Sequence, residues 1–337
     1  MIRSLFRLLS ARLRRRLPAA LLLAVPAFFL MVGGASAQDY PVRPIKLVVP
    51  YPPGGSSDFV ARMIAQKMSA TFKESVVVEN RPGASAMIGS EFVARSKADG
   101  YTLLFTGGGP HAINVSLFPR IPYDPLKDFD SIGLAMVISL LMTAPANAPY
   151  ANAQEFIAWA QRNRGKVNYC SIGSGSPSHL AAEMFASAAG IEMTHLPYKG
   201  SAPAIVDTIG GVCHVMFDSA LSSGPHVKSG KLRALGIASR TRLSAWPDVP
   251  TIAESGLPGY EAATWGCVLA PAGTPRAIVN RLNQELNQLL ALPDVRAALE
   301  KQGANPGGGT PQDLTAFTEA EIRKWGKVIR DGNIKPD

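Results

Sequence analysis

Residues 45–58 read Ile45-Lys46-Leu47-Val48-Val49-Pro50-Tyr51-Pro52-Pro53-Gly54-Gly55-Ser56-Ser57-Asp58, and this stretch decides the fold class of the chain. Its apolar start, which ends at Pro50, predicts a strand. Glycines and serines then form a short loop. Apolar residues follow at helical spacing: Phe59, Val60, Met63, Ile64 and Met68. A strand that runs through such a loop into a helix is the repeating step of an α/β fold.

The same alternation continues along the chain. Strands are predicted at Ile45–Val49, Val76–Glu79, Thr102–Thr106, Ile132–Ala146, Val167–Ser171, Met193–Leu196, Val215–Phe217, Leu232–Ala238 and Val268–Ala270. Further helices are predicted at Ile88–Ser96, Gln154–Gln161, His179–Ala189, Ala202–Ile209, Pro275–Leu290, Val295–Lys301 and Pro311–Arg330. The β-α-β-α-β order implies a parallel sheet with helices on its faces.

The last three predicted helices have no strand between them, so they must pack on a sheet that is already built. The plainest arrangement returns the chain to the first domain at about Trp265. We therefore expect two α/β domains with a cleft between them. Residues 38–135 and 263–337 form the first domain, and residues 136–262 form the second.

The N-terminus has the pattern of a cleaved secretory signal. A basic region contains Arg3, Arg7, Arg12, Arg14, Arg15 and Arg16. The apolar stretch Leu17–Val32 follows, and Ala35-Ser36-Ala37 supplies a signal-peptidase site, so residues 1–37 are expected to be removed and Gln38 to be the first mature residue. The alternative is a membrane anchor, but this apolar stretch is short for a span of ~20 residues. We expect a periplasmic protein.

The charge of the chain comes largely from this signal. It holds 6 of the 34 Lys and Arg residues and none of the 25 Asp and Glu residues, so the remainder has a net charge of about +3. No run of Lys and Arg with interleaved aromatic residues remains, and we expect no nucleic-acid partner.

Three cysteines, Cys170, Cys213 and Cys267, follow the signal. An oxidising compartment permits disulfides, but an odd number with spacings that match no metal site favours three buried thiols that act as small hydrophobic side chains. A single bridge between Cys170 and Cys213 is the alternative.

Two glycine- and serine-rich loops, residues 52–58 and 173–178, each lie between a strand and a helix. Free backbone N–H groups at a helix start, together with serine hydroxyls, suit a carboxylate or phosphate. Ordinary turn and cap chemistry is the alternative. A third loop, Gly107–Pro110, ends another strand and lines the same cleft in this interpretation. The predicted ligand-binding residues are Tyr51, Pro53, Gly54, Gly55, Ser56, Ser57, Asp58, Gly108, Ser174, Gly175, Ser176, His179 and Asp218.

Enzyme signatures are absent from the sequence. No nucleophile elbow, phosphate-binding loop, dinucleotide fingerprint or H-E-x-x-H pattern occurs, so we expect no catalytic residue, metal or cofactor. Asp58 fits a helix N-terminal charge better than an acid catalyst. For Asp218 the alternative to a cleft residue is a turn aspartate, and for His179 it is a capping or core histidine.

The motifs together resemble the Bug-type periplasmic solute receptors of tripartite tricarboxylate transporters. The matching stretches run from about Tyr40 to the C-terminal helix and lie at residues 40–45, 50–58, 78–84, 98–103, 122–125, 195–200, 230–235, 247–251 and 270–275. The resemblance implies a two-domain venus-flytrap (type II) fold and a binding protein rather than an enzyme. It also implies that a carboxylate is gripped between the loops Pro53–Asp58 and Ser174–His179.

The chain departs from the family pattern at Cys170 and Met87, which bear on ligand identity. The resemblance predicts capture of a small organic carboxylate and its delivery to transporter membrane subunits. Two rivals are a ligand-binding partner of a membrane sensor and a secreted hydrolase. No basic cluster marks either loop, and the expected wall is Tyr51, Ala86, Met87 and Ile172. We therefore expect a mono- or dicarboxylate with an apolar or aromatic body rather than citrate.

Overall fold

The computed structural model describes residues 40–243, 245–301 and 303–336. The predicted signal and its cleavage site lie outside these residues. The described strands are β1 (Ile45–Val49), β2 (Val76–Asn80), β3 (Thr102–Gly107), β4 (Phe129–Pro145), β5 (Asn168–Ser171), β6 (Thr194–Pro197), β7 (Val215–Ser219), β8 (Leu232–Ile237), β9 (Ala263–Pro271) and β10 (Ala304–Gly308). They form one sheet in the order β2-β1-β3-β9-β4-β7-β5-β6, with β8 and β10 also paired to β4.

The first half of the sheet contains β1, β2, β3, β9, β10 and the start of β4. Strand β1 pairs in parallel with β2 and β3, as the sequence predicts. The expected parallel sheet holds for these three strands but not throughout, because β9 runs antiparallel to both β3 and β4. The expectation of no strand among the last helices is wrong. Strand β10 pairs antiparallel with β4, although its sequence Ala304–Gly308 contains Pro306 and two glycines and therefore has the composition of a turn.

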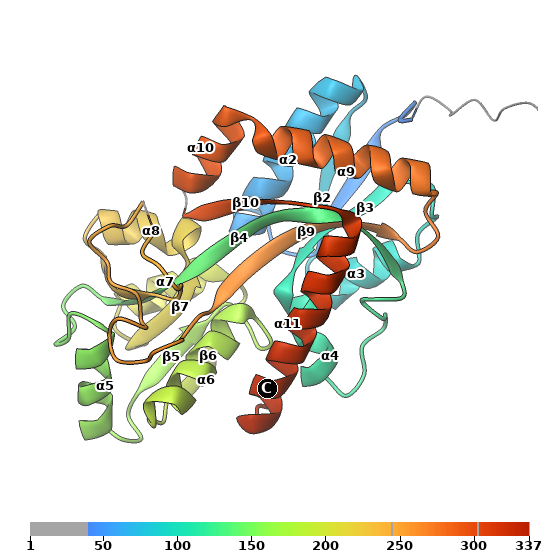
Figure 1. Cartoon of the computed structure of the whole chain (residues 1–337). Helices are drawn as coiled ribbons and strands as arrows, with labels where there is room; N and C mark the ends of the chain where they lie inside the picture. Colours follow the sequence, from blue (N-terminus) through green and yellow to red (C-terminus); the bar gives the residue numbers. More distant parts are fainter. Residues whose placement is uncertain (1–39, 244, 302, 337) are drawn as a thin grey trace, which may run out of the picture. The chain divides into compact units, whose positions relative to one another are not determined.

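The second half contains β5, β6, β7, β8 and the end of β4. Strand β5 pairs in parallel with β6 and β7, whereas β7 and β8 run antiparallel to β4. The apolar stretch near residue 140 is a buried strand, as predicted, and β4 is long enough at 17 residues to run through both halves. It is one of the two strands, with β9, that connect them (Figure 1).

The favoured expectation of three free thiols is wrong. Cys170 of β5 and Cys213, just before β7, form a disulfide with a Cα–Cα distance of 5.6 Å, and Cys267 is a buried free thiol. The pairing arises because β5 and β7 are neighbours in the sheet, although 43 positions separate the two cysteines in the sequence.

Helices cover both faces of each half (Figure 1). The described helices are α2 (Ser56–Phe72), α3 (Met87–Ala94), the π-helical turn η3 (Gly109–Ile113), α4 (Asn114–Leu117), α5 (Ala153–Arg162), α6 (Pro177–Ala189), α7 (Ser201–Ile209), α8 (Ala220–Lys228), α9 (Arg276–Ala291), α10 (Pro293–Lys301) and α11 (Pro311–Asp331). Helices α9 and α10 pack on β10, and α11 packs along β4 and beside α4. No helix of the described chain is both long and apolar enough to cross a membrane.

Helix α11 is fixed by local chemistry at its start and by a buried carboxylate near its end. Thr310 and Asp313 form a capping box, with Pro311 in the first turn. Farther along, Glu321 accepts hydrogen bonds from the indole N–H groups of Trp265 at 3.0 Å and Trp325 at 2.8 Å. Because Trp265 belongs to β9, this carboxylate anchors the last helix to the strand that joins the two halves.

Candidate functional site

The first predicted loop ends at the start of α2. Gly55 is the N-cap of this helix and contributes no side-chain hydrogen bond, so the first backbone N–H groups of α2 receive no capping oxygen from it. Gly54 has a φ of +86°, a conformation that favours glycine. A Cβ added at either Gly54 or Gly55 would meet no atom within 4 Å. The loop therefore leaves open space beside the N-terminus of a 17-residue helix.

Asp58 organises this loop from within the first turn of α2. Its carboxylate accepts hydrogen bonds from the Gly54 N–H at 3.0 Å, from Arg62 Nε at 2.9 Å and from Asn80 Nδ2 at 2.9 Å. Burial alone would raise the pKa of Asp58, but the hydrogen bonds from Arg62, Gly54 and Asn80 outweigh it and hold the pKa below 3.8. Asp58 is therefore an ionised group that shapes the loop.

Tyr51 precedes the loop, and its ring turns inward. Its hydroxyl would lie 3.7 Å from a Cβ built on Gly107, at the end of β3. Burial raises the pKa of the Tyr51 hydroxyl well above its usual range. The neighbouring Pro53 is exposed and Ser57 is half-buried.

The second predicted loop joins β5 to α6. The Ser176 hydroxyl caps α6 by accepting from the His179 N–H at 3.2 Å, and Pro177 occupies the first turn. The His179 ring supports the loop from below, because its Nδ1 accepts from the Gly175 N–H at 3.2 Å. Ser174 and Ser176 are half-buried, whereas Gly175 and His179 are buried.

Two stacked histidines lie beneath this loop. The rings of His179 and His195 have centroids 4.0 Å apart and are nearly parallel. His195 Nε2 is hydrogen-bonded to Ser171 Oγ at 2.6 Å, and this hydroxyl accepts from the Gly173 N–H at 3.1 Å. Each imidazole therefore fixes one glycine of the loop, His179 directly and His195 through Ser171. The sequence singled out His179 but gave His195 no role in the site.

Asp218 lies at the end of β7, one residue before the N-cap of α8. Its side chain is 2 % exposed, and its Oδ1 accepts from the Ser201 hydroxyl at 3.0 Å. Its Oδ2 is buried and accepts no hydrogen bond among the described residues. Burial raises the pKa of Asp218 to about 7, with smaller opposing effects from the Ser219 backbone and the Ser201 hydroxyl.

Hydrogen bonds cross from one half of the chain to the other at this edge. Ser56 Oγ, at the start of α2, lies 2.8 Å from Ser219 Oγ and 3.2 Å from Ser222 Oγ. These two hydroxyls are also bonded to each other at 3.0 Å, so the three form a closed triangle. Ser219 is the N-cap of α8. The sequence named Ser56 but missed Ser219 and Ser222, although a serine between a strand and a helix is a recognisable N-cap signal.

A second crossing involves the loop before α3. Ser85 Oγ donates to the Ser174 carbonyl at 3.4 Å, and Asn114 Nδ2 donates to the Ser85 carbonyl at 3.0 Å. Three consecutive non-glycine residues, Ala84, Ser85 and Ala86, have φ between +46° and +69°. Left-handed backbone costs roughly 1–3 kcal/mol per residue and concentrates at functional sites. We include Ser85 and Asn114 in the candidate site because of this contact between the two halves and the left-handed backbone beside it.

The third predicted loop is largely helical. Gly107 ends β3, and η3 begins at Gly109. The chain therefore continues almost directly from the strand into a turn of π-helix. Gly108 is buried, and a Cβ added there would lie 3.1 Å from Trp265 Nε1 and 3.6 Å from Pro177. Gly108 therefore allows close packing between η3, β9 and the start of α6 rather than forming an open loop.

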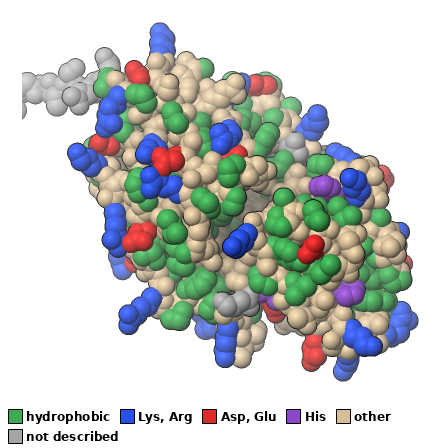
Figure 2. Space-filling view, turned by 180° about the vertical axis from the view of Figure 1, so that it is seen from behind, with side chains coloured by type: hydrophobic (Ala, Val, Ile, Leu, Met, Phe, Trp, Pro, Cys, Tyr) green, Lys and Arg blue, Asp and Glu red, His purple; other side chains and the backbone are tan. Residues whose placement is uncertain are grey.

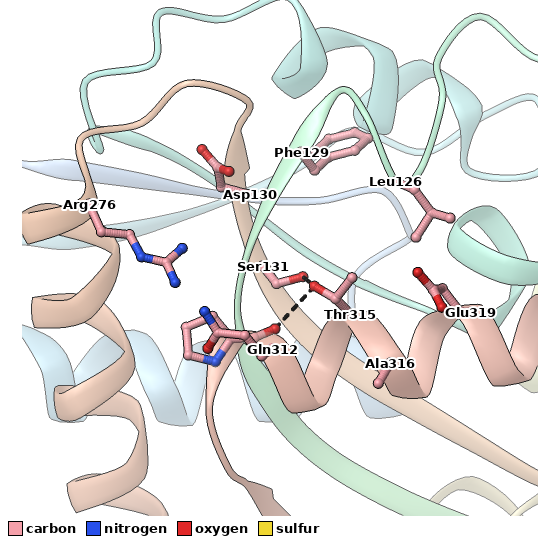
Figure 3. A pocket seen from close by; sticks show the side chains of 10 residues that line it. Leu126, Phe129, Asp130, Ser131, Arg276, Gln312, Thr315, Ala316 and Glu319 are labelled. Atoms are coloured by element: carbon pink, nitrogen blue, oxygen red, sulfur yellow. Dashed lines mark hydrogen bonds between the residues drawn. The ribbon is translucent and has the colours of Figure 1, made fainter.

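The expected wall residues are partly or fully buried. Met87 packs against the main core, Ile172 packs against the cluster around the disulfide, and Ala86 is the buried N-cap of α3. A separate cavity of about 350 Å³ lies between the start of β4 and the starts of α9 and α11. Figure 3 shows Asp130 and Arg276 among the side chains that line it, and the hydrogen bond between Ser131 and Thr315. This cavity contains none of the predicted site residues.

One face of the molecule shows how its basic side chains are distributed. On the face shown in Figure 2, Lys and Arg side chains are spread out rather than gathered in one patch. Among the described residues no group of three or more His, Cys, Asp or Glu side chains could hold a metal ion.

Comparisons with known proteins place the chain in a family. Residues 60–334 match the model of the tripartite tricarboxylate transporter family receptor. Protein BugT of Bordetella pertussis is 38 % identical over 319 residues, which cover 93 % of this chain and 98 % of BugT. The chain belongs to the receptors of the tripartite tricarboxylate transporter family.

Solved structures agree with this assignment. The structure of Rpa4515 from R. palustris with adipate has a TM-score of 0.86 and 37 % identity, and the match covers 88 % of this chain and all of that one. MatC from Rhodopseudomonas palustris with bound malate has a TM-score of 0.80 and 32 % identity, over 86 % of this chain and all of that one. The predicted family and the predicted two-domain solute-binding fold are confirmed, and this family member is a solute-binding receptor.

Proposed function

We propose that this receptor works in the periplasm, captures a small organic carboxylate in the cleft between the two halves of the sheet, and delivers it to the membrane subunits of a tripartite tricarboxylate transporter. Its two bodies are residues 38–135 with 263–337, and residues 136–262. The mature chain begins at Gln38, after cleavage behind Ala37. N-terminal sequencing of the exported protein tests this last point, and an intact Met1 in a membrane fraction would contradict it.

The observation that carries the proposal is the meeting of helix starts from both halves. Helix α2 of the first half approaches α8 of the second half at the Ser56–Ser219–Ser222 triangle. The start of α6 lies at the same carboxyl edge, under the second loop. Helix N-termini carry partial positive charge and unused N–H donors, and ligands of open α/β sheets gather at the carboxyl ends of strands.

The chemistry of the surrounding side chains favours a carboxylate held mainly by neutral donors. At the Ser56–Ser219–Ser222 crossing the hydrogen-bond donors are hydroxyls and backbone amides, and Arg62, which follows the first loop on α2, is paired with Asp58. A multiply charged phosphate ester usually recruits Arg or Lys side chains that are not already paired. The adipate and malate in the two structural neighbours support the same ligand class. The residues predicted from the sequence are proposed here as the site, with Asp58, Gly108 and His179 in supporting positions and the others as ligand contacts, together with Ser85, Asn114, Ser219 and Ser222.

Closure of the two halves supplies the mechanism of capture. Donors from α2 and from α8 reach one ligand only when the cleft is shut, so a bound carboxylate selects the closed state. The protein does not transform its ligand in this account, because the Ser171 hydroxyl that bonds His195 is fully buried beneath the second loop and is held by the Gly173 N–H.

Thermal-shift measurements test the function. The panel consists of adipate, glutarate, malate, benzoate and citrate, with glucose, a neutral amide and inorganic phosphate as controls. A ligand at ~100 times its Kd adds about 2.7 kcal/mol to the folded state. We expect stabilisation by mono- or dicarboxylates and none by the controls. A clear shift with glucose and none with the carboxylates would overturn the proposal.

A further inference from the structure

We propose that Asp218 carries a proton when the ligand is bound and donates it from Oδ2 to a ligand carboxylate, so that ligand capture takes up a proton. This inference rests on the proposed function and concerns the same cleft. It assigns a chemical role to one buried side chain and makes affinity depend on pH.

The first observation that supports this role is the position of Asp218. It immediately precedes Ser219, the N-cap of α8, whose hydroxyl contacts Ser56 of the first half. Ser201, which donates to the other carboxyl oxygen, is the first residue of α7. The carboxyl group therefore lies between the starts of two helices, at the edge where the two halves meet.

The second supporting observation is the carboxyl oxygen Oδ2 of Asp218, which is buried and has no hydrogen-bond partner among the described residues. Buried polar atoms without a partner are rare in folded proteins and call for an explanation at the site where they occur. A ligand that enters the cleft beside α8 supplies the missing partner.

The charges around Asp218 decide which form of the carboxyl is bound. The titratable or charged side chains on the elements packed against β7, and on the loop before α7, are Tyr169 of β5, Asp130 of β4, His179 and Glu183 of α6, Asp207 of α7, His226 and Lys228 of α8, and Tyr198 and Lys199 of the loop. None of these is a hydrogen-bond or ion-pair partner of Asp218.

Most of these groups are engaged elsewhere. Tyr169 bonds Glu183, Asp207 accepts from Tyr198, and Asp130 accepts from the Thr274 N–H. The two basic residues of α8, His226 and Lys228, lie in its last turn, away from Asp218. Arg62, on the facing helix, is paired with Asp58.

An anionic ligand beside an ionised Asp218 would place two negative charges together in a region of low dielectric, with no cation between them. Such a pair is strongly unfavourable, and like charges in one site force one member to hold a proton. The raised pKa of Asp218, about 7 before any ligand arrives, agrees with this direction. A second anion raises it further, so the proton comes from solvent on binding.

Calorimetry in buffers of different ionisation enthalpy tests the inference. The probe is the panel carboxylate that gives the largest thermal shift, and the pH range is 7.5 to 9, above the ordinary titration of carboxylates and histidines. We expect uptake of about 0.7 proton per ligand at pH 7.5 and an affinity that falls about tenfold per pH unit at higher pH. Asp218→Asn, which keeps a donor without a charge, should bind with no proton uptake and with affinity independent of pH in this range.

Asp207→Asn is the matched control, because Asp207 lies in the same half but is held by Tyr198; it should keep the proton uptake of the unmodified protein. If a carboxylate binds with no proton uptake, or if Asp218→Asn retains the uptake, the inference is wrong while the receptor function stands. Tighter binding as the pH rises would mean that a hydroxyl or amide N–H of the ligand donates to an ionised Asp218, and this outcome also refutes the inference. If no panel member binds, the proposed function itself fails.

Discussion

Each half of the molecule has an aspartate near a junction between a strand and a helix, and the two have opposite surroundings. Asp58 lies in the first turn of α2, and Asp218 lies at the end of β7. Asp58 accepts hydrogen bonds from Gly54, Arg62 and Asn80, and its pKa is lowered. Asp218 is bonded to Ser201 through one oxygen, its other oxygen is unused, and its pKa is raised to about 7. The difference separates a carboxylate that builds its loop from a carboxyl group that we propose binds the ligand.

The pH dependence of stability should expose this difference most strongly. The folded-state pKa of Asp218 lies above the unfolded value of 3.8, so between about pH 4 and pH 7 the folded state holds a proton that the unfolded chain has lost. Relative to Asp218→Asn, the unmodified protein should lose about 1.4 kcal/mol of unfolding free energy per pH unit as the pH rises through this window. Urea unfolding at several pH values measures it. If the difference in unfolding free energy between the two proteins does not change with pH, Asp218 does not have a raised pKa and the contrast with Asp58 fails.

Removing Asp58 should lower the free energy of unfolding rather than weaken ligand binding directly. Asp58→Ala leaves the Gly54 and Asn80 donors without their acceptor and breaks the pair with Arg62, so we expect a loss of about 2–3 kcal/mol in the free energy of unfolding at pH 7. This stability is present above the unfolded pKa and disappears as acid protonates Asp58. Asp294→Ala, which removes an exposed pair with Lys67, is the control and should leave the urea midpoint unchanged. Equal effects of the two variants would contradict the structural role of Asp58.

Bulk placed beside Asp58, at the N-cap of α2, should affect binding but not folding. Gly55 has an ordinary φ of −86°, and a side chain there meets no atom within 4 Å, so Gly55→Val should fold. The valine occupies the space beside the helix start, and we expect at least a tenfold loss of affinity, about 1.4 kcal/mol, by calorimetry. Gly210→Val, at the far end of α7, should bind normally. Unchanged affinity in Gly55→Val would move the site away from the first loop.

Removing one hydroxyl of the Ser56–Ser219–Ser222 triangle should have the smallest effect on ligand affinity. Ser222→Ala removes one of three hydroxyls that join α2 to α8 but leaves the Ser56–Ser219 bond, so we expect a two- to fivefold loss of affinity, about 0.5–1 kcal/mol. Ser229→Ala, just past the end of α8, is the control. If the two variants bind alike, the triangle does not contribute to closure.

The contrast between the two aspartates also shows what the sequence can predict. Apolar periodicity predicts most of the helices and strands, because those patterns act over a few neighbouring residues, but it misses η3, α4 and α8. Strand β10 was missed because its Asn-Pro-Gly-Gly composition favours a turn, and it forms only because β4 offers an edge. The Cys170–Cys213 bridge was not favoured because strand order, rather than spacing, brings the two cysteines together.

The candidate site is predictable from the sequence only where it follows strand ends. The two loops and Asp218 can be singled out because they lie between a predicted strand and the residues that follow it. The contact of Ser56 with Ser219 spans 163 positions and depends on how the two halves meet. Nothing in the local sequence distinguishes a satisfied Asp58 from an unsatisfied Asp218, because the difference lies in partners that come from other elements.

Carboxyl-carbon NMR of protein with isotopically labelled aspartate tests the central claim most directly. Spectra of Asp58→Asn and Asp218→Asn assign the two resonances, and a pH titration of the unmodified protein then follows both. We predict that the Asp218 resonance titrates with a midpoint near pH 7 and that the Asp58 resonance titrates below pH 3.8. Two midpoints that both lie below pH 4, or midpoints in the reverse order, would contradict the account.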